Sequence, residues 1–284
     1  MSSGSLTSRR PGAPRFEDLT ETTGIPLSEE GAVMMYTRYS YAAGLAAGLR
    51  VLELGCGSGQ GLGLLRRSAR FVAGGDFSGP LLASGRAHYG PALPLARLSA
   101  EALPFHPESF DLALLFEASY YVPDMAACFR EIDRVLAPGG TMVFVNANPE
   151  RPDFIASPHS VRYHTADEFR AALELLHYAV RVEGAFPVAE APGARGGVAG
   201  GGLVMARRAL EGLGLVPTTL RGRARLKRLV YGKLREVPAE LPEGYATVAP
   251  RVELARGPAP GYKVIYVNAR KRAAGTARPS VHSS

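Results

Sequence analysis

One segment decides how this chain folds: RVLELGCGSGQGLGLL, residues 50–65. Its first five residues have the apolar character of a buried strand, and glycines then occupy positions 55, 57, 59, 61 and 63. Because glycine lacks a Cβ, such a run either forms a flexible linker or lets a large polar ligand come close to the backbone. A strand pattern before the glycines and a helical pattern after them, over 61–68, favour the ligand over the linker.

The spacing of the glycines separates this run from two common nucleotide-binding turns. The dinucleotide fingerprint needs glycines at positions i, i+2 and i+5. In the four registers that begin at positions 55, 57, 59 and 61, the last position holds Gln60, Leu62, Leu64 or Arg66. The NAD or FAD interpretation therefore loses its main support. A P-loop is excluded as well, since no Gly-Lys-Ser/Thr sequence follows the glycines.

Strand and helix patterns also alternate along the rest of the chain. One helix is predicted over 27–49, where Ser28 suits an N-cap, and another over 165–179, where Thr165 and Glu168 have capping-box spacing. Strands separated by helices and short loops imply parallel pairing in an α/β sheet that is covered on both faces. The predicted strands are 50–54, 71–78, 94–98, 109–118, 141–148, 180–188 and 262–269, the last two as hairpin partners, and the other helices are 61–68, 80–89 and 124–136.

Four segments carry a resemblance to a known family. They are VLELGCGSGQG (51–61), AGGDFS (73–78), SAEALPFHPESFDLALLFEASYYVPD (99–124) and FREIDRVLAPGGTMVFV (129–145). In order and spacing they resemble the class I S-adenosylmethionine-dependent methyltransferases, and the likeness covers 34–188 together with YKVIYVNARK (262–271). The resemblance implies a Rossmann-like, doubly wound α/β sheet of seven strands with the last strand antiparallel. It also implies a helical insertion between strands six and seven, and S-adenosylmethionine as the cofactor.

The resemblance assigns three acidic or aromatic residues to the cofactor. Asp76, at the end of the second strand, would accept hydrogen bonds from both ribose hydroxyls, for which a carboxylate offers two acceptor oxygens. Phe77 would pack on the adenine, and Glu53 would approach the charged methionine moiety. Two plainer roles stay open: Asp76 caps the next helix together with Ser78, and Phe77 is an ordinary core aromatic.

Further cofactor contacts come from the backbone and from the N-terminal helix. The contacts implied by the resemblance are backbone groups of Gly55 and Phe116 at the amine, bare backbone at Gly57 and Gly59, and the Ala100 N–H with the Glu101 carboxylate near the adenine. The family often has Asp-Ala-Glu at this last point, whereas this chain has Ser-Ala-Glu at 99–101, so no side-chain contact is implied at position 99. Tyr36 or Tyr39 would close over the cofactor, although aromatic residues along a helix more often form core.

The candidate catalytic residues follow the fourth strand. Glu117, Tyr120 and Tyr121 fall where family members place acceptor-site residues, and the carboxyl ends of strands in open α/β sheets are where ligands bind. His159 and His164 are the other candidates for a general base, each with a plain loop or capping role as the alternative. Methyl transfer from a sulfonium needs chiefly positioning of the acceptor, so catalysis by proximity alone also stays open.

Composition bears on the cellular location of the protein and on its partners. The net charge of +7 is concentrated from residue 205 onward, where 16 Lys and Arg face 5 Asp and Glu, chiefly in 221–235 and 270–272. No apolar run is long enough for a transmembrane helix and the N-terminus has no apolar signal segment, which predicts a cytoplasmic protein. Two cysteines give neither a disulfide framework nor metal-ligand spacing, so we expect no metal.

These patterns predict a domain plan and a function. We expect a disordered arm (1–15), a methyltransferase core (16–190 and 261–272), a basic helical insertion (191–260) that forms a substrate lid hinged at 196–203, and a disordered tail (273–284). The main hypothesis is methyl transfer to a small molecule in bacterial specialised metabolism, with neither nucleic acid nor membrane as partner and with a homodimer as a further expectation. An RNA or nucleotide methyltransferase is the alternative, motivated by the basic C-terminal region. A binding or scaffold protein that kept the fold and lost transfer is a third hypothesis.

Overall fold

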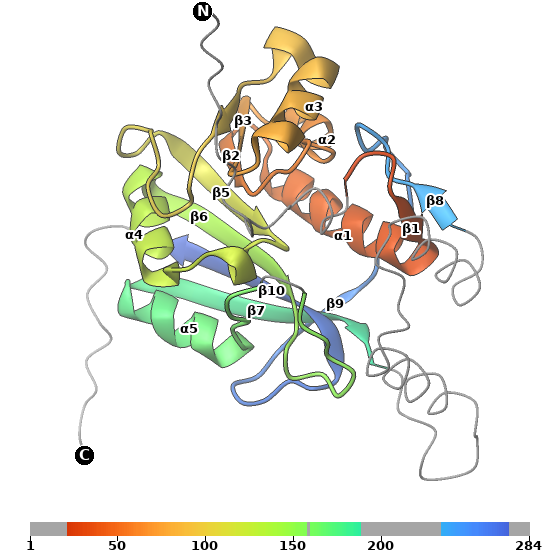
Figure 1. Ribbon diagram of the computed structural model, residues 1–284. Coiled ribbons are helices and arrows are strands. Elements are labelled where there is room, and N and C mark those ends of the chain that lie inside the picture. The colour runs from red at the N-terminus through yellow and green to blue at the C-terminus, as the bar shows by residue number, and fades with distance from the viewer. Residues whose placement is uncertain (1–21, 158–159, 189–233, 273–284) are drawn as a thin grey trace, which may run out of the picture.

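The computed structural model describes residues 22–157, 160–188 and 234–272 (Figure 1). Several predictions fall on residues outside this description: the two terminal arms, the hinge at 196–203, the basic segment as far as residue 233, and His159.

A mixed sheet of eight strands forms the centre of the described protein, in the order β4-β3-β2-β5-β6-β10-β7-β9. Neighbours from β4 to β6 are parallel, whereas β10 runs antiparallel to β6 on one side and to β7 on the other. The strands are β2 (Arg50–Leu54), β3 (Phe71–Asp76), β4 (Leu95–Arg97), β5 (Phe110–Phe116), β6 (Leu136–Ala147), β7 (Tyr178–Pro187), β9 (Arg251–Glu253) and β10 (Tyr262–Lys271). The seven predicted strands and the antiparallel last one are confirmed, and the structure adds the short edge strand β9, which pairs with β7.

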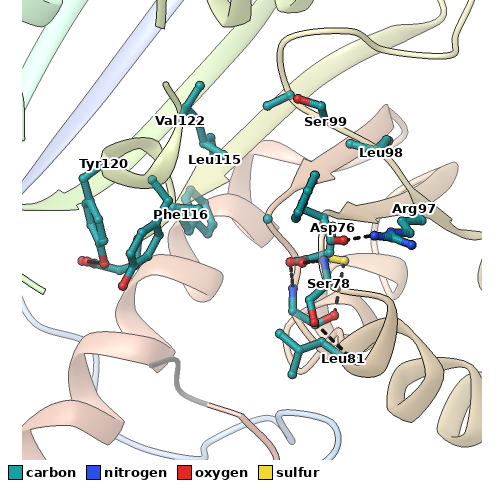
Figure 2. A pocket seen from close by; sticks show the side chains of 18 of the residues that line it. Asp76, Ser78, Leu81, Arg97, Leu98, Ser99, Leu115, Phe116, Tyr120 and Val122 are labelled. Atoms are coloured by element: carbon teal, nitrogen blue, oxygen red, sulfur yellow. Dashed lines mark hydrogen bonds between the residues drawn. The ribbon is translucent and has the colours of Figure 1, made fainter. Parts of the chain in front are cut away.

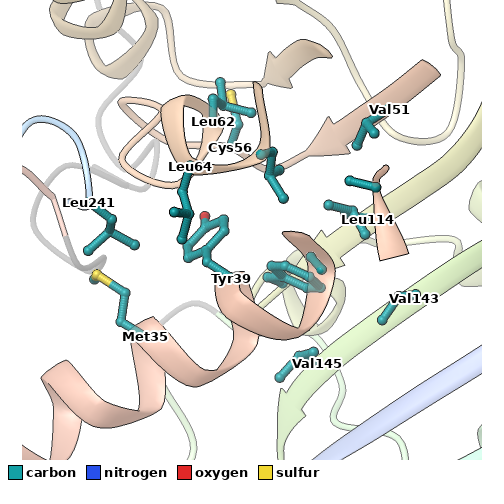
Figure 3. Close-up of a cluster of buried hydrophobic side chains, with 14 of the residues drawn as sticks. Met35, Tyr39, Val51, Cys56, Leu62, Leu64, Leu114, Val143, Val145 and Leu241 are labelled. Carbon is teal, nitrogen blue, oxygen red and sulfur yellow. The ribbon is translucent and has the colours of Figure 1, made fainter. Parts of the chain in front are cut away.

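Helices cover both faces of this sheet, so the doubly wound arrangement is confirmed (Figure 1). Side chains of α1, α2 and α3 pack on one face and those of α4 and α5 on the other, which gives two separate apolar cores. In the first core, Met35 and Tyr39 project from α1 towards Leu241 and Leu64 (Figure 3). The helices are α1 (Glu29–Leu45), α2 (Leu62–Arg66), α3 (Gly79–Tyr89), α4 (Met125–Val135) and α5 (Ala166–Leu175), with short 3-10 turns η2 (Gly90–Ala92) and η3 (Ser119–Tyr121).

Local capping explains where two of these helices begin. The Ser28 hydroxyl accepts the Gly31 N–H and starts α1 as predicted. Thr165 and Glu168 form the predicted capping box of α5, in which each side chain accepts the backbone N–H of the other residue. Both caps satisfy N–H groups that have no partner inside the helix, which fixes the helix starts.

β6 differs most from its prediction, whereas the other predicted strands differ by at most two residues at either end. β6 begins at residue 136, directly after α4, and not at residue 141. The sequence APGG at 137–140 suggested a loop, and the pairing of β5 with β6 does shift register here, between Phe110 and Leu112. Gly139 has a φ of +75°, so the chain bulges and then resumes the strand. A bulge keeps the segment in the sheet although its composition is that of a turn.

The described part of the insertion, 234–260, contains strands and no helix. β8 (Leu234–Glu236) pairs antiparallel with β1 (Pro26–Ser28) in a separate two-stranded sheet. Beyond β8 the chain runs along α1, where the Gly244 N–H donates to the Tyr36 hydroxyl and the Ala249 N–H to the Thr37 hydroxyl. We call residues 234–249 the α1 strap, because they hold this helix against the sheet.

Candidate functional site

The turn between β2 and α2 needs glycine for its backbone conformation. Gly55, Gly57 and Gly59 have φ of +67°, +58° and +84°, a region in which side chains with a Cβ are strained. A Cβ on Gly55 would also lie 2.6 Å from the Cβ of Ala118. The turn leaves the Gly57 N–H pointing at the Asp76 carboxylate, 2.8 Å from Oδ2. These three glycines therefore shape the turn and bring it against the end of β3.

The last two glycines of the run, Gly61 and Gly63, leave room for neighbouring side chains. A Cβ on Gly61 would lie 1.9 Å from the Tyr39 ring, and one on Gly63 would lie 2.1 Å from the Glu240 side chain. The ring of Tyr39 is rigid and buried, whereas Glu240 is flexible and partly exposed. Gly61 thus makes room for α1, and only the first three glycines serve the turn.

A cavity of about 840 Å³ lies over this turn at the carboxyl ends of β2, β3 and β5. Its size is within the range of small-molecule and cofactor sites. Predicted site residues that line it are Gly55, Gly57, Asp76, Phe77, Ala100, Glu101, Phe116, Glu117, Tyr120 and Tyr121. Predicted residues that do not line it are Tyr36, Glu53, Gly59 and His164. Figure 2 shows its two ends, with Asp76 and Arg97 at one and Phe116 and Tyr120 at the other.

Asp76 is held by two backbone donors at one end of the cavity. Its Oδ1 accepts the Ser78 N–H at 2.7 Å and its Oδ2 accepts the Gly57 N–H (Figure 2). The N-cap of α3 is Ser78, whose hydroxyl accepts the Leu81 N–H, so capping is not the role of Asp76 itself. A carboxylate has about four acceptor sites, which suits this side chain to bind hydroxyl groups of a ligand in the cavity.

Phe77 and Arg97 form an exposed platform beside Asp76. The Phe77 side chain is 61% exposed, which rules out the core role that its sequence left open. The Arg97 guanidinium lies 5.7 Å from the centre of the Phe77 ring and donates to the Phe77 carbonyl. Next to it, Ser99 takes the position where the family often has Asp, and its hydroxyl donates to the Glu101 carboxylate. A flat aromatic surface with a polar edge suits an aromatic base.

Glu53 lies behind the cavity wall and not in it. Its side chain is fully buried, and Oε1 accepts the Tyr39 hydroxyl at 2.6 Å while Oε2 has no hydrogen-bond partner. Burial raises the pKa of Glu53 to about 7. Tyr39 stands between Glu53 and the cavity, which is why the predicted direct approach of Glu53 is not seen.

On α1 the residues that reach the cavity are Arg38 and Tyr39 rather than Tyr36. The Tyr36 hydroxyl instead accepts the Gly244 N–H from the α1 strap. Sequence reasoning missed Arg38, whose only signal is a cation within the otherwise apolar MMYTRYSY stretch. Gln60, Ser157 and Val161 also line the cavity and were not foreseen.

The opposite end of the cavity is built around Glu117. This residue directly follows β5 with a φ of +48°, and its N–H donates to the Val145 carbonyl. The Tyr120 hydroxyl donates to Glu117 Oε2 at 3.0 Å, and the Tyr120 ring stacks on Tyr163 with the ring centres 4.3 Å apart. Burial and the Glu117 charge raise the pKa of Tyr120 well above its usual value, so Tyr120 stays a donor. Tyr121 pairs with the Ser157 hydroxyl at 2.5 Å.

The histidine candidates gain no support from the structure. His164 lies outside the cavity with its ring against Phe169, and burial lowers its pKa. His159 falls outside the described residues. In the part of the chain that the structure describes, no group of three or more His, Cys, Asp or Glu side chains is arranged to hold a metal ion. The same part contains no helix of the length and apolar character that a membrane crossing needs.

The strand order, the antiparallel β10 and the cavity over a glycine turn define the class I, S-adenosylmethionine-dependent methyltransferase fold. Residues 52–144 match the family described as the methyltransferase domain. The matched residues run from β2 into β6 and include one wall of the cavity. The chain therefore has the class I methyltransferase fold, and residues 52–144 are similar to the methyltransferase domain family.

Curated relatives match less than half of the chain. The phthiotriol/phenolphthiotriol dimycocerosates methyltransferase 1 of Mycobacterium ulcerans is 37% identical over 120 residues, 41% of this chain and 44% of that protein. The fatty-acid O-methyltransferase of Mycolicibacterium smegmatis is 35% identical over 133 residues, 44% of this chain and 48% of that protein. The chain therefore aligns with less than half the length of these relatives.

Solved structures share the fold over most of the chain. A methyltransferase from Archaeoglobus fulgidus superposes with a TM-score of 0.55 at 14% identity, over 86% of this chain and 96% of that one. The cyclase SpnF has the same TM-score at 17% identity, over 90% and 88% of the two chains. At such identities the likeness concerns the fold alone.

Proposed function

We propose that this protein transfers a methyl group from S-adenosylmethionine to a small-molecule acceptor in bacterial specialised metabolism. The observation that carries the proposal is Asp76, whose carboxylate lines the cavity and is held there by the N–H groups of Gly57 and Ser78. A carboxylate fixed in this way suits a pair of vicinal hydroxyls, and the bare turn beside it suits a ligand that lies close to the backbone.

The charge and shape of the cavity fit this donor. Its described lining residues include three carboxylates and two guanidinium groups, so the lining has a net charge of −1. This charge suits a donor that carries a sulfonium and an ammonium group. In the proposed arrangement Asp76 binds the ribose, Phe77 and Glu101 flank the adenine, and Arg38 binds the methionine carboxylate. S-adenosylmethionine supplies an activated methyl group, so the chain has chiefly to orient the acceptor and exclude water.

The curated relatives support a small, apolar acceptor. Both are named for lipid substrates. Residues 52–144, which match the methyltransferase domain family, form part of the cavity. The relatives lend no support to the RNA alternative. The net negative charge of the described cavity lining also disfavours a phosphate backbone. Most of the basic segment 221–235 falls outside the described residues.

Calorimetry with S-adenosylmethionine and with its demethylated product, S-adenosylhomocysteine, tests the proposal directly. We expect both to bind, and labelled donor to methylate a member of a panel of small apolar alcohols, phenols, acids and amines. NAD binding in place of S-adenosylmethionine would overturn the proposal. Because a cyclase shares this fold, donor binding without transfer to any acceptor would favour the third hypothesis, a binding protein without transfer.

A further inference from the structure

We infer that the acceptor of this site is a neutral hydroxyl on an apolar body, an alcohol or a phenol, and that Glu117 is the catalytic residue that takes its proton. The inference rests on the proposed function and names its substrate class.

Glu117 has a strained backbone conformation, with a positive φ. Four described residues other than glycine have positive φ: Glu108, Glu117, His177 and Phe186. Among these four, Glu117 is the one whose side chain lines the cavity. Strained residues that persist at a ligand site are a common sign of a functional constraint. The N–H of Glu117 donates to Val145 at 2.8 Å, and this bond holds the strained turn in place.

The Glu117 carboxylate is also bound by a fixed hydrogen-bond donor. The Tyr120 hydroxyl donates to its Oε2, and Tyr120 is itself fixed by burial and by its stack on Tyr163. Because a carboxylate has about four acceptor sites, Glu117 can accept from Tyr120 and from an acceptor hydroxyl at the same time. A base must lie within hydrogen-bond reach of the proton that it removes, and this arrangement provides such a base inside the cavity.

The surroundings of Glu117 select the rest of the acceptor. Besides Tyr120, Tyr121 and Ser157, the lining residues from β5, the turns on either side of η3 and the loop after β6 are apolar: Leu115, Phe116, Ala118, Val122, Pro123 and Val161. They suit a hydrocarbon body. A carboxylic acid would bring a second negative charge beside Glu117, which a partly buried site disfavours. An acid acceptor would already be deprotonated and would have no use for a base.

The reaction balances with these groups alone. The hydroxyl gives its proton to Glu117 while its oxygen forms the new bond to the methyl carbon. The carbon–sulfur bond of the donor breaks and leaves its electron pair on sulfur. The products are a methyl ether, S-adenosylhomocysteine and a protonated Glu117, which returns its proton to water.

A matched pair of probes tests the inference: 4-pentylphenol and 4-pentylbenzoic acid at pH 8, titrated calorimetrically into full-length protein saturated with S-adenosylhomocysteine. We expect the wild type to bind the phenol at least tenfold more tightly than the benzoate. Glu117→Gln removes the charge and keeps the shape, so we expect the difference to fall below about threefold. Glu108→Gln is the matched control, since Glu108 also has a positive φ but is exposed and lies outside the cavity, and we expect it to behave as the wild type.

Transfer to the phenol gives a second measurement on the same variants. We expect Glu117→Gln to lower the rate of methylation of 4-pentylphenol by about 100-fold or more, the usual contribution of a general base. Tighter binding of the benzoate by the wild type, binding of neither probe, or an unchanged rate in Glu117→Gln would overturn the inference while leaving the proposed function intact. Failure of S-adenosylhomocysteine to bind would overturn both.

Discussion

Replacement of Asp76 by alanine tests the donor site at its best-defined point. In the protein its two oxygens accept the Ser78 and Gly57 N–H groups at 2.7 and 2.8 Å. In the proposed complex they also accept two ribose hydroxyls, each bond to a charged acceptor contributing about 1.5 kcal/mol. Loss of both bonds amounts to about 3 kcal/mol, and S-adenosylhomocysteine should therefore bind about 150-fold more weakly. Isothermal titration calorimetry measures this change directly.

A second variant separates loss of binding from loss of stability. Asp111 forms an ion pair with Arg50 near the start of β5, at the end of the strand away from the cavity, with 2.7 Å between Oδ1 and the guanidinium. Asp111→Ala should lower the unfolding temperature and leave the dissociation constant for S-adenosylhomocysteine within about threefold of the wild type. A dissociation constant that is unchanged in Asp76→Ala, or an equal loss in both variants, would refute the assignment of the ribose to Asp76.

Three further predictions concern the fold around the site. The pKa of Glu53 is raised from 4.5 to about 7, so the unfolded chain loses this proton first as pH rises, and unfolding free energy should fall by about 3 kcal/mol between pH 4.5 and 7. Urea unfolding should detect this fall and find it abolished in Glu53→Gln; an unchanged pH dependence in the variant would contradict it. Gly61→Ala drives a Cβ into the Tyr39 ring and should cost about 1–3 kcal/mol, whereas Gly44→Ala, which meets nothing within 4 Å, should stabilise α1 by about 0.5 kcal/mol or more. His177→Gly relieves a φ of +63° after α5 and should raise the unfolding free energy by about 0.5–1 kcal/mol in the same assay; a loss of stability would show that the His177 side chain matters more than its backbone strain.

The sequence was sufficient for the sheet because its strands are marked locally. The apolar runs around β2, β5 and β10 are each bounded by turn residues, and the glycine turn points to the carboxyl edge of the sheet where the cavity lies. Asp76 could be placed for the same reason, since it ends a strand next to that turn. Local patterns of this kind are retained when the chain folds.

The parts that could not be foreseen depend on contacts between distant residues. Gly61 and Gly57 look alike in the sequence, yet one makes room for Tyr39 and the other shapes the turn. Tyr36 and Tyr39 are three positions apart on α1, yet Tyr36 binds the α1 strap while Tyr39 binds Glu53 and lines the cavity. β8 and β1 are three-residue strands about 200 positions apart, too short for any periodic signal.

The place of β10 has a consequence for how the chain is made. This last strand lies between β6 and β7 and pairs with both along its length, so β6 and β7 have no direct partner in each other. During synthesis from the N-terminus, the facing edges of β6 and β7 stay unpaired until residue 271 has left the ribosome. Strand edges exposed in this way are prone to pair wrongly. Deletion of β10 would therefore separate β6 from β7 in the middle of the sheet. Deletion of an edge strand such as β9 would only make the sheet narrower.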